Sequence, residues 1–393
     1  MAQQHLDPPT DPTAGISQRL SAPPAPALVR GERPGPGGTA LGDALADYLR
    51  AQATEFLRSL RHHRENGAGG GSAVRGEPKA GEPGQGGPEE PGDAALALRR
   101  SARRISGTLH TFRPLLDAEW SEGIRPELAW LSGTLAREHA YSARLERLLT
   151  ALHRLSGSTV FPAQTAGAAA DGSGPGPRTQ SAVQERGNLT VGAAKAGALL
   201  ERQLTLARTR AHSAALGALG SSRFHAVADS VAVLASEVPL TPAAAGTDLC
   251  PLAAAAEERL SDAVSALPLI TAGHPYNAEA LIHGLSPDPA PHPQDGPWHQ
   301  VRLLLRLHRY AREVLHGEEE AVDVRLLAAG GALNRHRDAS EAAAAAASAA
   351  RTPRIAPATA YALGVLHADQ RHEVEAARFA FQQAWQRQTV GAP

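Results

Sequence analysis

The sequence predicts an all-helical fold in which helices pack on helices. Aromatic residues make up only 4 % of the 393-residue chain, alanine is abundant, and runs of β-branched residues are few. Alanine is the strongest helix former, and helices become stable by burying their apolar faces against one another. A chain of this length exceeds what one compact core usually supports, so two lobes or one large repeat-built domain are expected.

The N-terminal part alternates helical patterns with segments rich in proline and glycine. Residues 1–38 have no periodic apolar pattern and are expected to form a disordered tail. A regular apolar stripe predicts a first helix over about residues 41–63, and residues 66–92 form a Gly/Pro/Glu linker. An amphipathic helix with a basic face follows over about residues 93–116, and Pro114 marks its end.

The middle of the chain continues in the same way. The helical pattern resumes at about Pro126 and continues to residue 155, and residues 156–188 form a second linker. Residues 189–238 are again helical in pattern, with a break predicted at residues 220–222, where glycine is followed by two serines.

The C-terminal part predicts five further helices. They span about residues 252–267, 277–285, 298–312, 324–350 and 358–388. A proline-rich loop at residues 286–297 and an acidic loop at residues 318–320 flank the helix at 298–312.

That helix, WHQVRLLLRLHRYAR, carries a basic stripe on one face. The stripe comprises His299, Arg302, Arg306 and Arg309, at spacings of three, four and three. Leucines at positions 303, 304, 305 and 307 fill most of the remaining surface, and a helix that is apolar almost all round is a buried one. The stripe is therefore expected to line a cleft whose partner is an anion.

A second group of arginines lies on the helix predicted at residues 93–116. It comprises Arg99, Arg100, Arg103 and Arg104. Arginine side chains supply planar forks that suit phosphate or carboxylate. The two helices together could form a track for a flexible polyanion, whose binding would weaken steeply with salt. The alternative is that these arginines only pair with surface carboxylates or lie along the surface.

Several classes of function are not supported by the sequence. The single cysteine, Cys250, excludes an internal disulfide and a cysteine-rich metal site. The sequence has no apolar run of about 18 residues, no signal segment and no P-loop, zinc-protease or nucleophile-elbow motif. We therefore expect a cytoplasmic protein that is not an enzyme, with no cofactor, no metal and no membrane partner.

Two segments with basic residues resemble the CHAD family, the conserved-histidine α-helical domains. Residues 299–310 follow that family's pattern H-x-x-R-K-x-x-K-R-x-R-Y at His299, Arg302, Arg306, Arg309 and Tyr310. Residues 109–120, LHTFRPLLDAEW, are similar to the continuation of its first basic helix, on which Arg99, Arg103 and Arg104 match. The chain departs from the family at Leu96, Ser106, Leu303 and Leu307.

Two further segments add to the resemblance. Residues 130–148 are similar to a family helix that bears Arg-Asp, here Arg137 and Glu138. Residues 333–338 look like its counterpart L-G-x-H-x-D, with His336 and Asp338 matching.

The resemblance implies two antiparallel four-helix bundles related by a pseudo-twofold, over about residues 39–188 and 189–390. It further implies that basic side chains in the groove between them bind inorganic polyphosphate, with an association with polyphosphate granules as an extension of that role. The expected binding set is Arg99, Arg100, Arg103, Arg104, Arg137, His299, Arg302, Arg306, Arg309, Tyr310, Arg335 and His336.

Two other functions remain as alternatives. One is a helical scaffold that binds another protein, whose identity the sequence does not give, and has a weakened affinity for polyanions. The other is a phosphohydrolase that uses the histidines with a metal, which the missing carboxylate cluster disfavours. Nucleic acid is disfavoured as a ligand because few aromatic residues lie near the basic faces, where bases could stack.

Overall fold

The computed structural model describes residues 38–69, 91–157, 177–274, 285, 292–317 and 323–386. Within these ranges all regular elements are helical, and the only β contact is an isolated antiparallel bridge between Leu116 and Leu240. The prediction of an all-helical fold is therefore confirmed.

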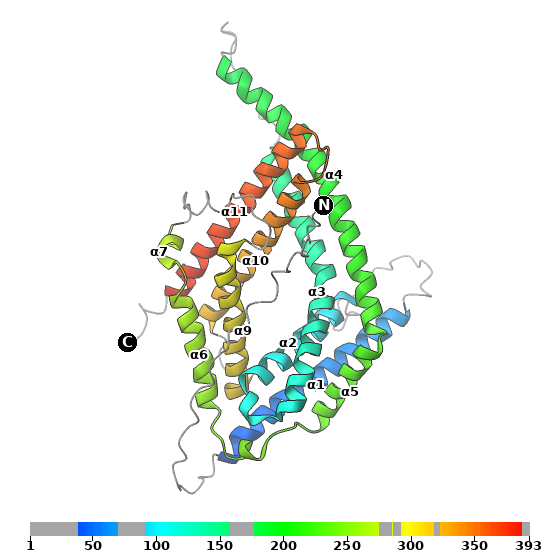
Figure 1. Ribbon diagram of the computed structural model, residues 1–393, viewed down its shortest axis with the longest axis vertical. Helices are drawn as coiled ribbons and strands as arrows, with labels where there is room; N and C mark the ends of the chain where they lie inside the picture. Colours follow the sequence, from blue (N-terminus) through cyan, green and yellow to red (C-terminus); the bar gives the residue numbers. More distant parts are fainter. Residues whose placement is uncertain are drawn as a thin grey trace, which may run out of the picture. The chain divides into compact units, whose positions relative to one another are not determined.

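α-Helices, most of them long, make up this architecture (Figure 1). They are α1 (Gly38–Gly69), α2 (Pro91–Thr111), α3 (Ala118–Leu155), α4 (Pro177–Leu219), α5 (Ser222–Ser236), α6 (Cys250–Ser265), α7 (Leu269–Ala272), α9 (Gly296–His316), α10 (Val324–Ala350) and α11 (Pro357–Gln386). Three short 3₁₀-helices accompany them, namely η1 (Arg113–Leu115), η2 (Pro242–Ala244) and η3 (Pro293–Asp295).

The start of α3 differs from the prediction at Pro126. The helix begins eight residues earlier, because the carboxylate of Asp117 accepts a hydrogen bond of 2.8 Å from the backbone N–H of Trp120 and caps it. Pro126 lies inside the helix. The break predicted at residues 220–222 is confirmed, and there the Ser221 hydroxyl caps α5 by accepting from the N–H of Phe224.

Two other boundaries concern the predicted linkers. Helix α4 begins at residue 177, inside the segment expected to be a linker up to residue 188. The tail at residues 1–37, most of each linker and the acidic loop at 318–320 lie outside the described residues, as does the predicted helix at 277–285 except for Leu285.

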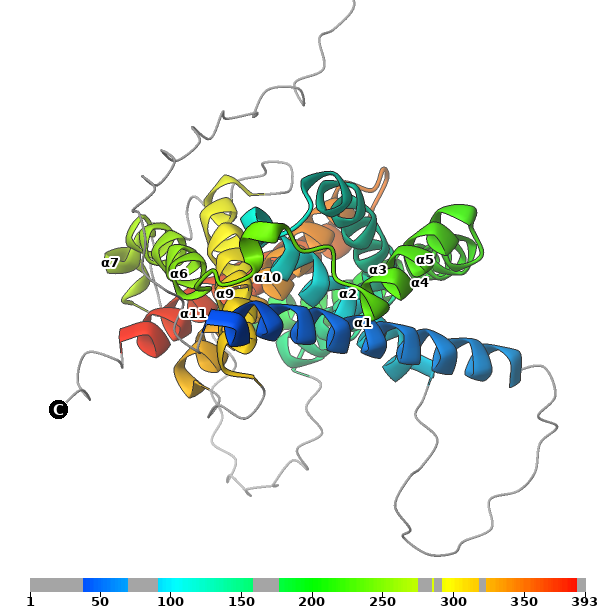
Figure 2. The same cartoon turned by 90° about the horizontal axis from the view of Figure 1, so that it is seen from below.

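The apolar core consists of three clusters, each built from helices that are distant in sequence. The first joins α1, α2, the first half of α3, α5 and the start of α6 to the end of α9, and Figure 2 shows α1 running along α2 and α5. The second joins the end of α3 and α4 to α10 and α11, and the third joins α6, α9, α10 and α11. The clusters cross residue 188, and the division into two bundles at that point stays a prediction.

The two basic helices predicted from the sequence are in direct contact. A Cβ atom on Gly107 of α2 would lie 2.7 Å from the ring of Tyr310 on α9. Only glycine therefore lets the helices approach this closely at that position. Because of this contact, the arginines of α2 lie next to those of α9.

Candidate anion-binding groove

A groove of about 420 Å³ lies where α2, α3, α9 and α10 meet. Its charged or polar lining comprises Arg99, Arg103, Ser106, His110, Arg125, Ser132, Arg302, Arg306, Tyr310 and Arg337. Small and apolar residues complete it, namely Gly107, Leu128, Ala129, Gly133, Ala136, Leu303 and Leu307. Six of these residues are arginines, and none of the described residues that line the groove is acidic.

Helical spacing explains how four of the arginines reach the groove. Arg99 and Arg103 are four residues apart on α2, and Arg302 and Arg306 are four residues apart on α9. Residues at this spacing point to the same side of a helix. Each helix therefore supplies one wall with two guanidinium groups.

The residues that the structure describes do not satisfy these four guanidinium groups. The Nε atoms of Arg99, Arg103, Arg302 and Arg306 are buried without a hydrogen-bond partner. The one side-chain bond that any of them makes within the described residues is long, 3.4 Å from Arg302 to the Oδ1 of Asn334. Buried polar groups normally have partners, so the described residues leave hydrogen-bonding capacity of these guanidinium groups unused.

The electrostatics of the groove favour an anion. The pKa of Arg302 is lowered to about 9, first by burial and then by the guanidinium groups of Arg306 and Arg337. The pKa of Arg99 is lowered to about 10 by burial and by neighbouring arginines, and burial also lowers the pKa values of Arg103 and Arg306. All four are therefore cations held close together, and a bound anion would relieve their repulsion.

Arg104, the next arginine on α2, has a different role. Its Nε donates to the Oε2 of Glu313 on α9 at 2.9 Å, and the Tyr48 hydroxyl of α1 donates to the same oxygen at 2.8 Å. This part-buried triad ties three helices together beside the groove. The guanidinium of Arg104 is thus paired with a carboxylate and does not line the groove.

His299 lies near the groove without lining it. The imidazole is partly buried, its Nε2 has no hydrogen-bond partner, and its ring meets that of His336 edge-on at 5.6 Å between centroids. Burial lowers the pKa of His299, with Arg302 and Arg337 contributing and Asp295 opposing. The imidazole is therefore neutral at neutral pH.

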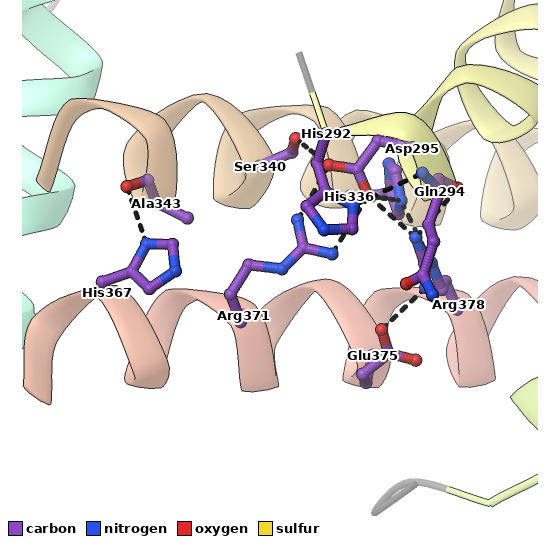
Figure 3. A network of polar contacts seen from close by, with 10 residues as sticks. All are labelled: His292, Gln294, Asp295, His336, Ser340, Ala343, His367, Arg371, Glu375 and Arg378. Atoms are coloured by element: carbon purple, nitrogen blue, oxygen red, sulfur yellow. Dashed lines mark hydrogen bonds and ion pairs between the residues drawn. The ribbon is translucent and has the colours of Figure 1, made fainter. Parts of the chain in front are cut away.

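His336 lies in a buried polar cluster, which we call the Asp295 cluster (Figure 3). Its members are Asp295, His336, Ser340, Arg371, Glu375 and Arg378. The carboxylate of Asp295 is fully buried, and it accepts hydrogen bonds of 2.8 Å from both Arg371 and Arg378 and a further one from the hydroxyl of Ser340. This cluster joins the start of α9 to α10 and α11.

Within this cluster His336 acts as an acceptor. Arg378 Nε donates to its Nε2 at 3.3 Å, and its ring stacks on Trp298 with centroids 5.6 Å apart. Burial and then Arg378 lower the pKa of His336 to about 3. His336 is 1 % exposed and lies outside the groove lining, so we leave it out of the binding set proposed below.

The remaining residues of the expected binding set lie outside the groove lining. Arg100, Arg137 and Arg335 are exposed, and Arg309 is partly buried. Three groove residues with charged or titratable side chains were not in that set. Arg337 directly follows His336, so the motif at residues 333–338 indicated the correct turn of α10. His110 lies within the matched segment 109–120 but was given no role there, and Arg125 lies in none of the matched segments.

Two further observations concern the residues that the structure describes. No three or more His, Cys, Asp or Glu side chains among them are grouped so as to hold a metal ion. None of the described helices is long and apolar enough to cross a membrane.

The comparisons with known proteins agree with this architecture. The model of the CHAD domain matches residues 79–346, a range that contains α2, α3, α9 and most of α10. The chain belongs to the CHAD domain family. This family is associated in general with polyphosphate.

A solved structure titled PptA from Streptomyces chartreusis is similar to this CHAD protein. The two are 68 % identical, with a TM-score of 0.68, and the match covers 88 % of this chain and 99 % of that one. No curated protein matches the chain.

Proposed function

We propose that this CHAD protein binds inorganic polyphosphate in the groove, without converting it chemically. The observation that supports this most directly is the lining itself. Six arginines from four helices face one groove that no described acidic residue lines, and the Nε atoms of four of them are buried without partners.

Polyphosphate matches this lining in charge and in geometry. It carries roughly one negative charge per phosphate along a flexible chain, and each contact with a cation releases counterions. Guanidinium forks donate two parallel hydrogen bonds to phosphate oxygens. Arg99 and Arg103 on one wall and Arg302 and Arg306 on the other could therefore hold successive phosphates.

The extent of the groove also suggests how the ligand is held. Arg125 from α3 and Arg337 from α10 add cations from two further helices, so the positive lining is not limited to a pair of walls. Arg337 also pairs with Asp338 on its own helix, with Nε to Oδ1 at 3.0 Å. A polyanion would compete with that carboxylate for Arg337.

Charge reversal at two groove positions tests the proposal. Wild-type protein should bind long-chain polyphosphate at low salt and release it as salt rises. The double variant Arg302→Glu/Arg306→Glu should lose at least about 100-fold in affinity, because each hydrogen bond to a charged group contributes about 1.5–3 kcal/mol. The slope of log affinity against log salt should fall by about 1.4, or about 0.7 for each lost contact.

The matched control reverses two arginines that do not line the groove. Arg208 and Arg210 are exposed on α4, and Arg208→Glu/Arg210→Glu makes the same change in net charge. This variant should retain binding to within a few-fold. If wild type does not bind polyphosphate at low salt, or if the two double variants weaken binding equally, the groove is not a polyphosphate site and the scaffold alternative gains support.

A separate measurement tests the absence of turnover. Wild-type protein is incubated with polyphosphate and Mg²⁺ or Mn²⁺, and the released orthophosphate is quantified against a protein-free sample. The proposal expects no release above that background. Release that is lost in the Arg302→Glu/Arg306→Glu variant would favour a phosphohydrolase.

A further inference from the structure

One part of the groove differs from the rest because it contains a titratable base. His110, in the last turn of α2, and Arg125, on α3, both line the groove. The Nδ1 of His110 and a terminal guanidinium nitrogen of Arg125 are 3.0 Å apart. Arginine is always a donor, so His110 accepts this bond and is neutral, with its proton on Nε2.

The groups around this pair are mostly cationic. Arg125 also donates to Glu122 at 2.9 Å, and Glu122 is shared with Arg113, whose Nε lies 3.0 Å away. The charge of Arg259 on α6 also acts on His110. The Nε of Arg125 is buried without a partner.

This environment lowers the pKa of His110. His110 is exposed as a residue, and partial desolvation of its ring is the largest cause. The charges of Arg125, Arg259 and Arg113 act in the same direction, while Glu122 opposes them. The unliganded groove therefore holds His110 in its neutral form at neutral pH.

We propose that His110 and Arg125 form a proton-coupled phosphate subsite, in which binding of the polyanion is coupled to protonation of His110. This inference rests on the proposed function and adds a subsite to it. A protonated imidazole can no longer accept the bond from Arg125, because both of its nitrogens then carry protons. Arg125 and His110 thus become two donors that can bind the same phosphate.

The sign of the pH dependence follows from linkage. An anion near His110 stabilises the imidazolium and raises its pKa, so binding takes up a proton and affinity increases as pH falls. Uptake of one proton changes affinity by at most about tenfold per pH unit. Arg302, whose pKa is about 9, stays mostly charged between pH 6 and pH 8 and contributes little to this dependence.

The test measures polyphosphate affinity at constant ionic strength between about pH 8 and about pH 6, where an unperturbed histidine changes charge. Wild-type affinity should rise about 3–10-fold as pH falls over this range. His110→Gln should lose most of that rise, and His110→Arg, with a permanent cation, should bind well with a flatter profile. His139→Gln changes an exposed histidine of α3 outside the groove and should retain the wild-type profile.

The second measurement follows the imidazole of His110 by NMR with tripolyphosphate as the probe. Its pKa should rise when tripolyphosphate is added, and this readout does not depend on titration of the ligand's own terminal phosphates. Equal pH profiles for wild type and His110→Gln, or an unchanged His110 pKa, would overturn the subsite. A wild-type protein that fails to bind at every pH would instead overturn the proposed function.

Discussion

Arginine occurs in two opposite settings in this protein. In the Asp295 cluster, Arg371 and Arg378 are almost fully buried, and both donate to one carboxylate. In the groove, Arg302 and Arg306 are partly buried and have no acidic partner among the described residues. The same side chain thus completes a closed network in one place and lines an open groove in the other.

The difference shows where stability and function reside. Guanidinium groups in the Asp295 cluster are matched by Asp295 and Glu375, so their interactions hold α9, α10 and α11 together. In the groove, Arg99, Arg103, Arg302 and Arg306 repel one another, and no ion pair among the described residues compensates them. The two settings are close in sequence, because Asp295 directly precedes α9 and Arg302 lies on α9.

The largest expected effect is the loss of one arginine from the Asp295 cluster. Arg371→Met removes both hydrogen bonds from Arg371 to the buried carboxylate of Asp295 and leaves the cluster with excess negative charge. Breaking a buried ion pair on one side costs about 3–5 kcal/mol, and we expect that loss in the free energy of unfolding. Urea denaturation followed by circular dichroism measures it. A loss below about 1 kcal/mol would show that the cluster does not contribute to stability as argued.

A smaller effect should appear when the cluster is titrated. His336 has its pKa lowered to about 3 in the fold, so between pH 6.5 and that value the unfolded chain takes up a proton that the folded chain does not. Its contribution to stability is therefore complete above about pH 6.5 and declines as pH falls, by about 1.5 kcal/mol between pH 6.5 and about pH 5. Asp295, whose pKa is lowered to about 2, acts in the same direction only at lower pH.

The variant His336→Asn isolates this contribution. It removes the titrating group while keeping a polar side chain of smaller volume next to Arg378. Its unfolding free energy should be lower than that of wild type at neutral pH but should fall less between pH 6.5 and 5. Parallel curves for the two proteins would mean that His336 is not the group that makes the fold sensitive to acid.

The sequence predicted the arginine walls because helical spacing alone determines which residues share a face. Arg99 with Arg103, and Arg302 with Arg306, needed no knowledge of tertiary packing. The rotation of α10 about its own axis is set by packing, so the sequence could not tell that Arg337 faces the groove while His336 is buried. Arg125 was missed because the helix was expected to begin one residue later, at Pro126.

The Asp295 cluster was beyond sequence-based prediction for a related reason. Asp295 lies in a segment whose prolines indicated a loop, where an acidic residue is usually solvated. Its arginine partners are 76 and 83 residues away in sequence, and no local pattern links them to it. Only the packing of η3 against α11 brings the three charges together.

The smallest effect is expected from the same substitution made in the groove. Arg302→Met removes a partly buried cation whose pKa is lowered by burial and by Arg306 and Arg337. The folded state therefore loses the repulsion between these guanidinium groups together with the solvation of Arg302. Without ligand, the free energy of unfolding should change by no more than about 0.5 kcal/mol, with an increase as the favoured sign. With polyphosphate present, wild type should gain thermal stability by ligand linkage and Arg302→Met should gain clearly less. A loss approaching that of Arg371→Met would mean that Arg302 holds the fold together, and the contrast between the two settings would fail. A small change without ligand and a large one with it would place the energetic contribution of this arginine in binding.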